Sequence, residues 1–228
     1  MKKKTIALAL VLVMVFGATL GGTFAYLTST DTVTNTFTVG NVQIKLDEAK
    51  VNLYGEPVDK NGKTASEATT EWTAADRVKT NEYKLIPGHE YTKDPTVTVL
   101  AKSESSYIRM LVTVTYSEDA DEVFVTHNYQ GWFNFDNQNW TAQPDVKTTR
   151  GEGKITRTYE FRYYATVDGY VDGVAADVEL PALFTKITVP DGISNDDLAK
   201  LADLKITVEA HAIQADGFND AADAWSKF

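Results

Sequence analysis

The sequence predicts an all-β protein, an antiparallel β-sandwich with a few short peripheral helices. Three observations support this prediction. Apolar and polar residues alternate with a period of two along most of the chain, which is typical of antiparallel strands with one buried and one solvated face. Helical spacing is confined to two short segments near the C-terminus. The length of the chain also suits a β-sandwich that forms one domain.

The first 25 residues have the pattern of a cleaved export signal. A run of three lysines gives a positively charged start, and residues 6–16 form an apolar run. Small residues follow, with Thr23 and Ala25 at the −3 and −1 positions of a cleavage site. The apolar run is short for a transmembrane span, although a retained N-terminal anchor is the alternative. We therefore expect residues 1–25 to be removed and the mature chain to begin at Tyr26.

The mature chain would be strongly acidic and free of cysteine. Cleavage removes three of the 22 Lys and Arg residues and none of the 32 Asp and Glu residues, which leaves 203 residues with a formal net charge of −13. Such a chain is repelled by nucleic acid, so we expect no binding to a phosphate backbone. The lack of cysteine excludes cysteine nucleophiles, zinc–thiolate sites and iron–sulfur clusters. Residues 26–228 should form a single sandwich domain without disulfides.

The strand patterns begin directly after the predicted cleavage site. Residues 32–39 alternate between apolar residues and threonines, and residues 42–46 alternate with the opposite phase. A two-residue hairpin turn or a β-bulge at Gly40-Asn41 would explain this change, and we favour the bulge. Later strand patterns cover residues 96–101, 107–116, 154–167, 184–189 and 204–213. Their apolar faces supply the predicted core: Val97, Val99, Ala101, Ile108, Met110, Val112, Val114, Tyr116, Ile155, Tyr159, Phe161, Tyr163, Ala165, Ile187, Val189, Ile206, Val208, Ala210 and Ala212.

Two short helices and one long loop complete the predicted fold. Ser194 is followed three residues later by Asp197, which is the pattern of a capped helix start. The last 13 residues place apolar side chains at helical spacing, so this stripe should pack on a sheet. The stripe consists of Phe218, Ala221, Ala222, Trp225 and Phe228. Residues 49–84 are polar and lack a sustained period, so we expect a surface excursion with a short helix near residues 73–78.

His89 and Glu90 match only the start of the zinc-protease pattern H-E-x-x-H. The pattern needs a second histidine four residues after the first, but that position is Lys93. His127 and His211 are the only other histidines, so a zinc site would have to be assembled from distant segments. We therefore assign no catalytic, cofactor-binding or metal-ligating residue and expect no cofactor.

Three further patterns have ordinary structural interpretations. Residues 117–122 are acidic but lack the glycine and the spacing of an EF-hand loop, so we expect a solvated turn. Residues 129–140 concentrate five aromatic side chains, from Tyr129 to Trp140. In β-proteins such rings are mostly core residues, with a surface platform for a ligand as the alternative. Asn139 begins an N-glycosylation pattern, which is a weak match because it is short.

Several stretches together resemble one family. The sequence LGGTFAYLTSTDTVTNTFTVGNVQIKL around the signal end resembles exported proteins that an endoplasmic-reticulum-type signal peptidase processes in Gram-positive bacteria. The stretches LIPGHEYTKDPTVTV, SYIRMLVTV, FRYYATV, LPALFTKITVP and ITVEAHAIQADGF are similar to the central and C-terminal strands of the same proteins. Apart from residues 49–84, most of the chain resembles the TasA/camelysin family.

This resemblance implies a jelly-roll sandwich that is secreted and forms fibres of an extracellular biofilm matrix. The implied partners are further copies of the chain and, during export, the signal peptidase; a minor anchoring or nucleating matrix protein is also compatible. Camelysin-like members have been classed as cell-surface metallopeptidases, which is the alternative function. The incomplete zinc pattern at His89 does not support that alternative, so we expect a structural protein that is not an enzyme.

Residues 26–36 are the candidate for the connection between subunits. This segment is β-prone and has few residues that a core could use before Val33. A segment of this kind is suited to adding a strand to the exposed sheet edge of a neighbour. The residues assigned to this donor strand are Tyr26, Leu27, Thr28, Val33 and Phe37.

Overall fold

The computed structural model describes residues 40–69, 71–164 and 169–228, and Val39–Phe228 form one compact unit. Several predictions fall outside these residues and stay predictions. They are the export signal at residues 1–25, the cleavage residues Thr23, Ala25 and Tyr26, the strand at residues 32–39, and the donor-strand residues Tyr26, Leu27, Thr28, Val33 and Phe37.

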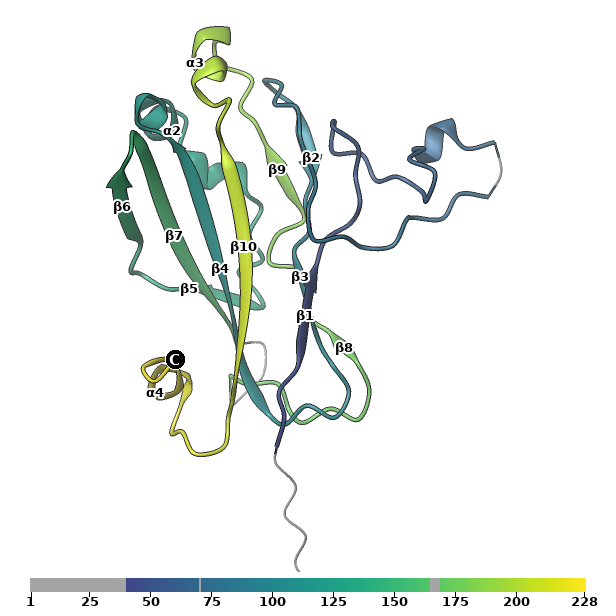
Figure 1. Ribbon diagram of the computed structural model, residues 1–228, viewed down its shortest axis with the longest axis vertical. Helices are drawn as coiled ribbons and strands as arrows, with labels where there is room; N and C mark the ends of the chain where they lie inside the picture. The colour runs from purple at the N-terminus through teal and green to yellow at the C-terminus, as the bar shows by residue number, and fades with distance from the viewer. Residues whose placement is uncertain (1–39, 70, 165–168) are drawn as a thin grey trace, which may run out of the picture. The chain divides into compact units, whose positions relative to one another are not determined.

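The larger sheet has five antiparallel strands (Figure 1). Their bounds are Ser106–Ser117 for β4, Trp140–Ala142 for β5, Lys147–Gly151 for β6, Lys154–Tyr163 for β7 and Lys205–Gln214 for β10. The order is β10-β4-β7-β5, and β6 also pairs with β7. β10 therefore forms one edge of the sheet, and β5 and β6 follow one another along the other edge. Every residue of β6 is exposed.

A second layer of shorter strands faces this sheet (Figure 1). It contains a three-stranded sheet with the order β1-β3-β8, formed by Ile44–Asp47, Thr96–Val99 and Val178–Glu179. It also contains the pair β2 and β9, formed by Glu90–Thr92 and Lys186–Thr188. All of these pairings are antiparallel. The prediction of an all-β protein built from antiparallel sheets is confirmed.

The core lies between the two layers and follows the predicted alternation, except that Ala101 is exposed because β3 ends at Val99 and the chain turns there. Ala165 of the predicted core lies outside the described residues. In β4 the side chains of Ile108, Met110, Val112, Val114 and Tyr116 are each at most 2% exposed. The side chains between them are only partly buried and face outward. Of the cluster at residues 129–140, four rings are buried and pack in the core: Tyr129, Trp132, Phe133 and Trp140. The core interpretation of this cluster is therefore confirmed.

Short helices lie at the ends of the strands. They are η1 (Ala65–Glu67), η2 (Glu118–Ala120), α2 (Asp121–Thr126), η3 (Tyr129–Trp132), α3 (Asn195–Lys200) and α4 (Ala221–Trp225). The predicted cap of α3 is confirmed, because the Asp197 amide donates to Ser194 Oγ at 3.1 Å. The acidic residues 117–122 form η2 and the start of α2, not a simple turn. Asp121 there accepts hydrogen bonds from Tyr116, Arg150 and Arg157.

Two of the helix predictions were wrong in detail. Residues 73–78 are not helical, because Arg77 is held in an extended segment by the contacts described below. At the C-terminus, Ala224 and Trp225 are buried, whereas Ala222 is exposed. The helical period fails there because α4 is only five residues long and the chain before Ala221 is not helical.

Adjacent residues of α2 give a test of the core. Phe124 is 1% exposed and its ring contacts Tyr116, Tyr129 and Trp132, whereas the neighbouring Val125 is 68% exposed. Phe124→Ala should lower the free energy of unfolding by about 3–5 kcal/mol, because it removes a buried ring and leaves a cavity. Val125→Ala should change it by about 0.5 kcal/mol or less. Urea denaturation of both variants checks this, and equal effects would contradict the packing.

Candidate functional site

A groove of about 1470 Å³ runs between β1 and β10, the strands that end their respective sheets. Both strands contribute to its walls, and the chain at residues 78–85 and residues 198–204 forms the rest of its rim. Core side chains form its floor: Tyr91, Trp132 and Ile187. β1 starts beside the end of β3, and β10 ends beside the start of β4. A short turn joins the end of β3 to the start of β4, so β1 and β10 run in opposite directions along the groove. We call the end where β1 starts the lower end, as in Figure 1.

Within residues 40–69, 71–164 and 169–228, no strand pairs with the backbone of β10 on the side of the groove. Ser106 of β4 exchanges hydrogen bonds of 2.8 and 2.9 Å with Val171, on the side away from β10. Backbone groups alternate in direction along an antiparallel strand, so the odd-numbered residues of β4 pair with the odd-numbered residues of β10. The even-numbered residues of β10 therefore direct their N–H and C=O groups into the groove. The even-numbered residues that line the groove are Ile206, Val208 and Ala210.

The free edge of β1 is shorter. The Gln43 carbonyl accepts from the Leu100 amide at 2.9 Å, so the odd-numbered residues of this segment face β3. On the opposite side, Glu48 exchanges hydrogen bonds of 2.8 and 2.9 Å with Val78. Between these two points, the described part of the chain provides no strand partner for Ile44 and Leu46 on the side of the groove.

Gly40 and Asn41 lie just before β1. Asn41 lacks the positive φ that a type I′ hairpin turn requires at both of its central residues. The Asn41 carbonyl instead accepts from the Glu104 amide at 2.9 Å, which ties this segment to the turn between β3 and β4. Both a hairpin turn and a bulge at Gly40-Asn41 involve residues 32–39, which lie outside the described residues, so the preference for a bulge stays a prediction. The chain reaches β1 from the lower end of the molecule (Figure 1).

Side-chain packing is incomplete along the same groove. Ile206, Val208, Ala210 and Ala212 point toward the core, yet each is only partly buried. Their counterparts in β4 are at most 2% exposed although they have the same alternation. Ile44 and Leu46 across the groove are also only partly buried. The groove thus combines free backbone groups with apolar side chains that lack cover, which is what an added strand would supply.

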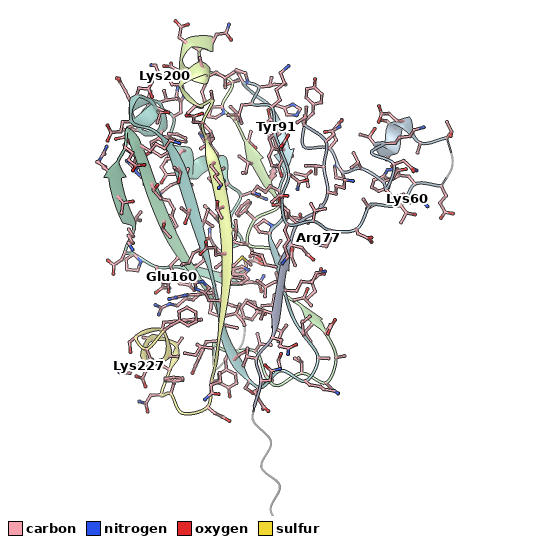
Figure 2. The ribbon with its side chains drawn as sticks, viewed as in Figure 1. Lys60, Arg77, Tyr91, Glu160, Lys200 and Lys227 are labelled. Carbon is pink, nitrogen blue, oxygen red and sulfur yellow. The ribbon has the colours of Figure 1, made fainter. Side chains whose placement is uncertain are left out.

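Arg77 holds the rim of the groove in place (Figure 2). Its guanidinium donates five hydrogen bonds: to Asp47 Oδ1 at 2.6 Å, Asp94 Oδ2 at 2.8 Å, the Asp47 and Asp94 carbonyls at 3.1 and 2.9 Å, and Thr96 Oγ1 at 3.0 Å. Burial opposes the ionisation of Asp47, but the hydrogen bonds from Lys45 and Arg77 outweigh it and lower the pKa of Asp47 below its usual range. Because Arg77 is fixed, the following residue Val78 pairs with Glu48 and leads the chain along the rim.

A buried ion pair lies beside this clamp. Lys93 Nζ is 2.5 Å from Glu48 Oε2, and both side chains are at most 10% exposed. Asn81 Nδ2 donates to the other oxygen of Glu48 at 2.9 Å. Burial, followed by the negative charge of Glu48, raises the pKa of Tyr83 far above its usual value. These contacts fix three segments of the rim, from β1, from the excursion and from the chain after β2.

The other candidate residues from the sequence are not brought together. His89 precedes β2, and its Nε2 is 2.7 Å from the carbonyl of Tyr54. Glu90 pairs with Lys186 at 2.6 Å on the surface. Among the described residues, no group of three or more His, Asp or Glu side chains could hold a metal ion. Asn139 donates to Asp136 Oδ2 at 2.6 Å and is half-buried.

Sequence reasoning missed Arg77, Lys93 and Glu48. A buried charge gives no signal in an alternating pattern, because the partner lies on another segment.

No helix of the described residues is long and apolar enough to span a membrane. Comparisons with protein-family models, with curated proteins and with solved structures found no match.

The buried ion pair gives a stability prediction. Lys93→Met should lower the free energy of unfolding by about 3–5 kcal/mol, because Glu48 would remain buried without its partner. The matched control is Lys186→Met at the surface, where Lys186 and Glu90 are 43% and 55% exposed and the pair is worth about 1 kcal/mol or less. Urea denaturation measures both. Adding Glu48→Gln to Lys93→Met should restore part of the loss, and no recovery would contradict the explanation.

The lowered pKa of Asp47 gives a dependence on pH. A carboxyl group whose pKa is lower in the folded state adds stability above its unfolded pKa of about 3.9 and loses it as the pH falls through the folded pKa. The difference in free energy of unfolding between the wild type and Asp47→Asn should therefore be largest above about pH 5 and shrink toward about pH 2. Urea denaturation across this range measures the difference. A constant difference would show that ionised Asp47 contributes nothing.

Proposed function

We propose that this protein is a secreted structural protein whose mature copies assemble head to tail into extracellular fibres. Residues from Tyr26 onward would enter the groove between β1 and β10 of the next subunit and add the missing strand. The observation that carries the proposal is the groove itself, because its free backbone groups and its uncovered apolar side chains lie along the same line. Donor and acceptor surfaces differ, so the contact is heterologous and gives open filaments.

The arrangement of the strands defines how the donor would pair. The chain enters β1 at the lower end of one subunit, so the proposed donor segment would leave the subunit at that end. In a head-to-tail filament it enters the next subunit from the upper end and lies antiparallel to β10. This extends the antiparallel order of the five-stranded sheet, which is the pairing that short connections and free edges favour.

The alternation of the donor segment suits both sides of that sheet. The apolar residues Leu27, Val33 and Phe37 would face the core side of the groove, and the threonines between them would face outward. The polar residues Ser29, Asp31 and Asn35 share the face of the apolar residues, so apolar contacts would concentrate at Leu27 and from Val33 to Phe37. The outer face of the sheet already carries paired hydroxyl groups, Thr113 with Thr158 and Thr115 with Thr156, each pair 3.1 Å apart. Threonines of the donor would extend these rows across β10.

Burial of apolar side chains decides whether the free energy of adding the donor strand is favourable. Ordering the donor backbone costs roughly 1–2 kcal/mol per residue, and each new hydrogen bond returns about 1 kcal/mol. These two contributions nearly cancel, so the net gain comes from buried side chains such as Leu27 and Phe37, at roughly 1.5–3 kcal/mol each. Subunits with a net charge of −13 also repel one another until salt or acid reduces the repulsion. Assembly should therefore depend on solution conditions.

With its donor strand the fold would be a completed jelly-roll-like sandwich, as the resemblance to the TasA/camelysin family implies. The proposed location is the extracellular matrix or cell surface. The proposed partners are further copies of the chain, the signal peptidase that exposes Tyr26, and no nucleic acid. Neither a cofactor nor catalytic activity is part of the proposal.

Neighbouring residues of β10 test the groove directly. Val208→Lys places a charge on the face that lines the core, so it should abolish filaments that the mature wild type forms at about pH 5. Thr207→Lys adds the same charge on the outer face and should leave filaments present. Electron microscopy and light scattering measure assembly, and circular dichroism checks that both variants fold. Filaments of Val208→Lys equal to those of the wild type would contradict the proposal.

A truncation tests the donor segment. A variant that begins at Asp31 lacks Tyr26, Leu27 and Thr28 and should remain a folded, soluble monomer under the same conditions, because it has lost part of the strand that fills the groove. Analytical ultracentrifugation measures its size. Assembly of this variant as efficient as that of the mature chain would exclude the N-terminal segment as the connector.

A further inference from the structure

The turn at residues 52–55 exposes two neighbouring apolar side chains at the upper end of the groove. Leu53 is 49% exposed and Tyr54 is 44% exposed. Seven large hydrophobic residues are exposed in the described part of the chain, and these two are its only adjacent pair. Leu53 also lines the groove. Scattered single apolar residues at a surface need no explanation, but an adjacent pair at the mouth of a groove indicates a contact surface.

Hydrogen bonds hold this turn in one conformation. Asn52 Oδ1 accepts from the amides of Tyr54 and Glu56 at 2.9 and 3.1 Å. The Asn52 carbonyl accepts from the Gly55 amide at 3.0 Å, and the Leu53 carbonyl accepts from the Lys84 amide at 2.8 Å. The two apolar side chains are therefore presented by a fixed backbone, and a partner would lose little conformational freedom in binding them.

Gly55 sets how closely this turn can approach the sheet. Its φ is +73°, and a Cβ atom at this position would lie 2.6 Å from Cα of Tyr91. Any other residue would clash with the β2 backbone as well as being strained. The Gly55 carbonyl accepts from the Thr92 amide at 3.0 Å, which seals the turn against β2. The turn is thus fixed to the subunit at the end opposite to Gly40.

We infer that the turn at residues 52–55 is a second contact between successive subunits, in which Leu53 and Tyr54 pack against the body of the subunit that donates the strand. The inference rests on the proposed strand donation. A donor segment that enters from the upper end brings the lower end of its own subunit against this turn. Val178 lies at that lower end and is 39% exposed. It pairs with Val99, and Val99 also pairs with Ile44 at the start of β1. An apolar pair would therefore meet an apolar residue of a second copy.

The experiment separates strand binding from the second contact. The probe is a fluorescent synthetic peptide with the sequence of residues 26–39, and the protein is the full mature chain. Peptide binding is measured by anisotropy at neutral pH and low salt, where the acidic chain is expected to stay monomeric. Filament formation is measured as the critical concentration at about pH 5. The variant is Tyr54→Ser, because Tyr54 does not line the groove. The control is Val146→Ser, which is 40% exposed and lies just before β6 at the opposite edge of the five-stranded sheet.

Tyr54→Ser should bind the peptide like the wild type but raise the critical concentration about tenfold, which corresponds to about 1.4 kcal/mol. Val146→Ser should change neither quantity. An unchanged critical concentration in Tyr54→Ser would overturn the second contact while leaving strand donation intact. A parallel loss of peptide binding would also overturn it, because the turn would then act only by shaping the groove. Absence of peptide binding to the wild type would overturn strand donation itself, and the inference with it.

Discussion

Backbone hydrogen bonding is the constraint on which the proposed assembly depends. Backbone groups of a sheet that are removed from water need hydrogen-bond partners, and three residues of β10 direct theirs into a groove that no described strand occupies. The side chains of the same residues are only partly covered, whereas those of the neighbouring β4 are almost completely buried. Hydrogen bonding and packing are independent properties, and both are incomplete along the same line. A single added strand would satisfy both.

The sequence predicted the strands well because alternation directly reports which face of a strand is buried. Val97, Met110 and Ile155 were all expected in the core and are all fully buried. Alternation does not report which strand lies beside another. β4 and β10 have the same pattern, yet one lies in the middle of its sheet and the other at its edge. For this reason the sequence alone suggested a donor segment but could not locate the groove that would receive it.

Long-range polar contacts explain the main errors of the sequence reading. Residues 73–78 contain good helix-forming residues, but five hydrogen bonds from Arg77 hold them in an extended conformation against β1 and β3. Lys93 was considered only because it occupies the place of a missing zinc ligand, whereas it neutralises the buried Glu48. Both residues position the rim of the groove. The excursion at residues 49–84 is therefore part of the proposed site, although only its anchored ends take part.

The opposite edge of the five-stranded sheet has a different character. β6 is exposed along its whole length and carries Lys147 and Arg150, and charged side chains on an edge strand discourage pairing with further strands. Among the described strands, one edge of this sheet is thus open to a further strand, while the part of the other edge that β6 forms is protected by charge. Subunits built in this way would lengthen a thread without widening it into a sheet. Its thickness would be that of one subunit, and any bundling of threads would have to use forces other than strand pairing.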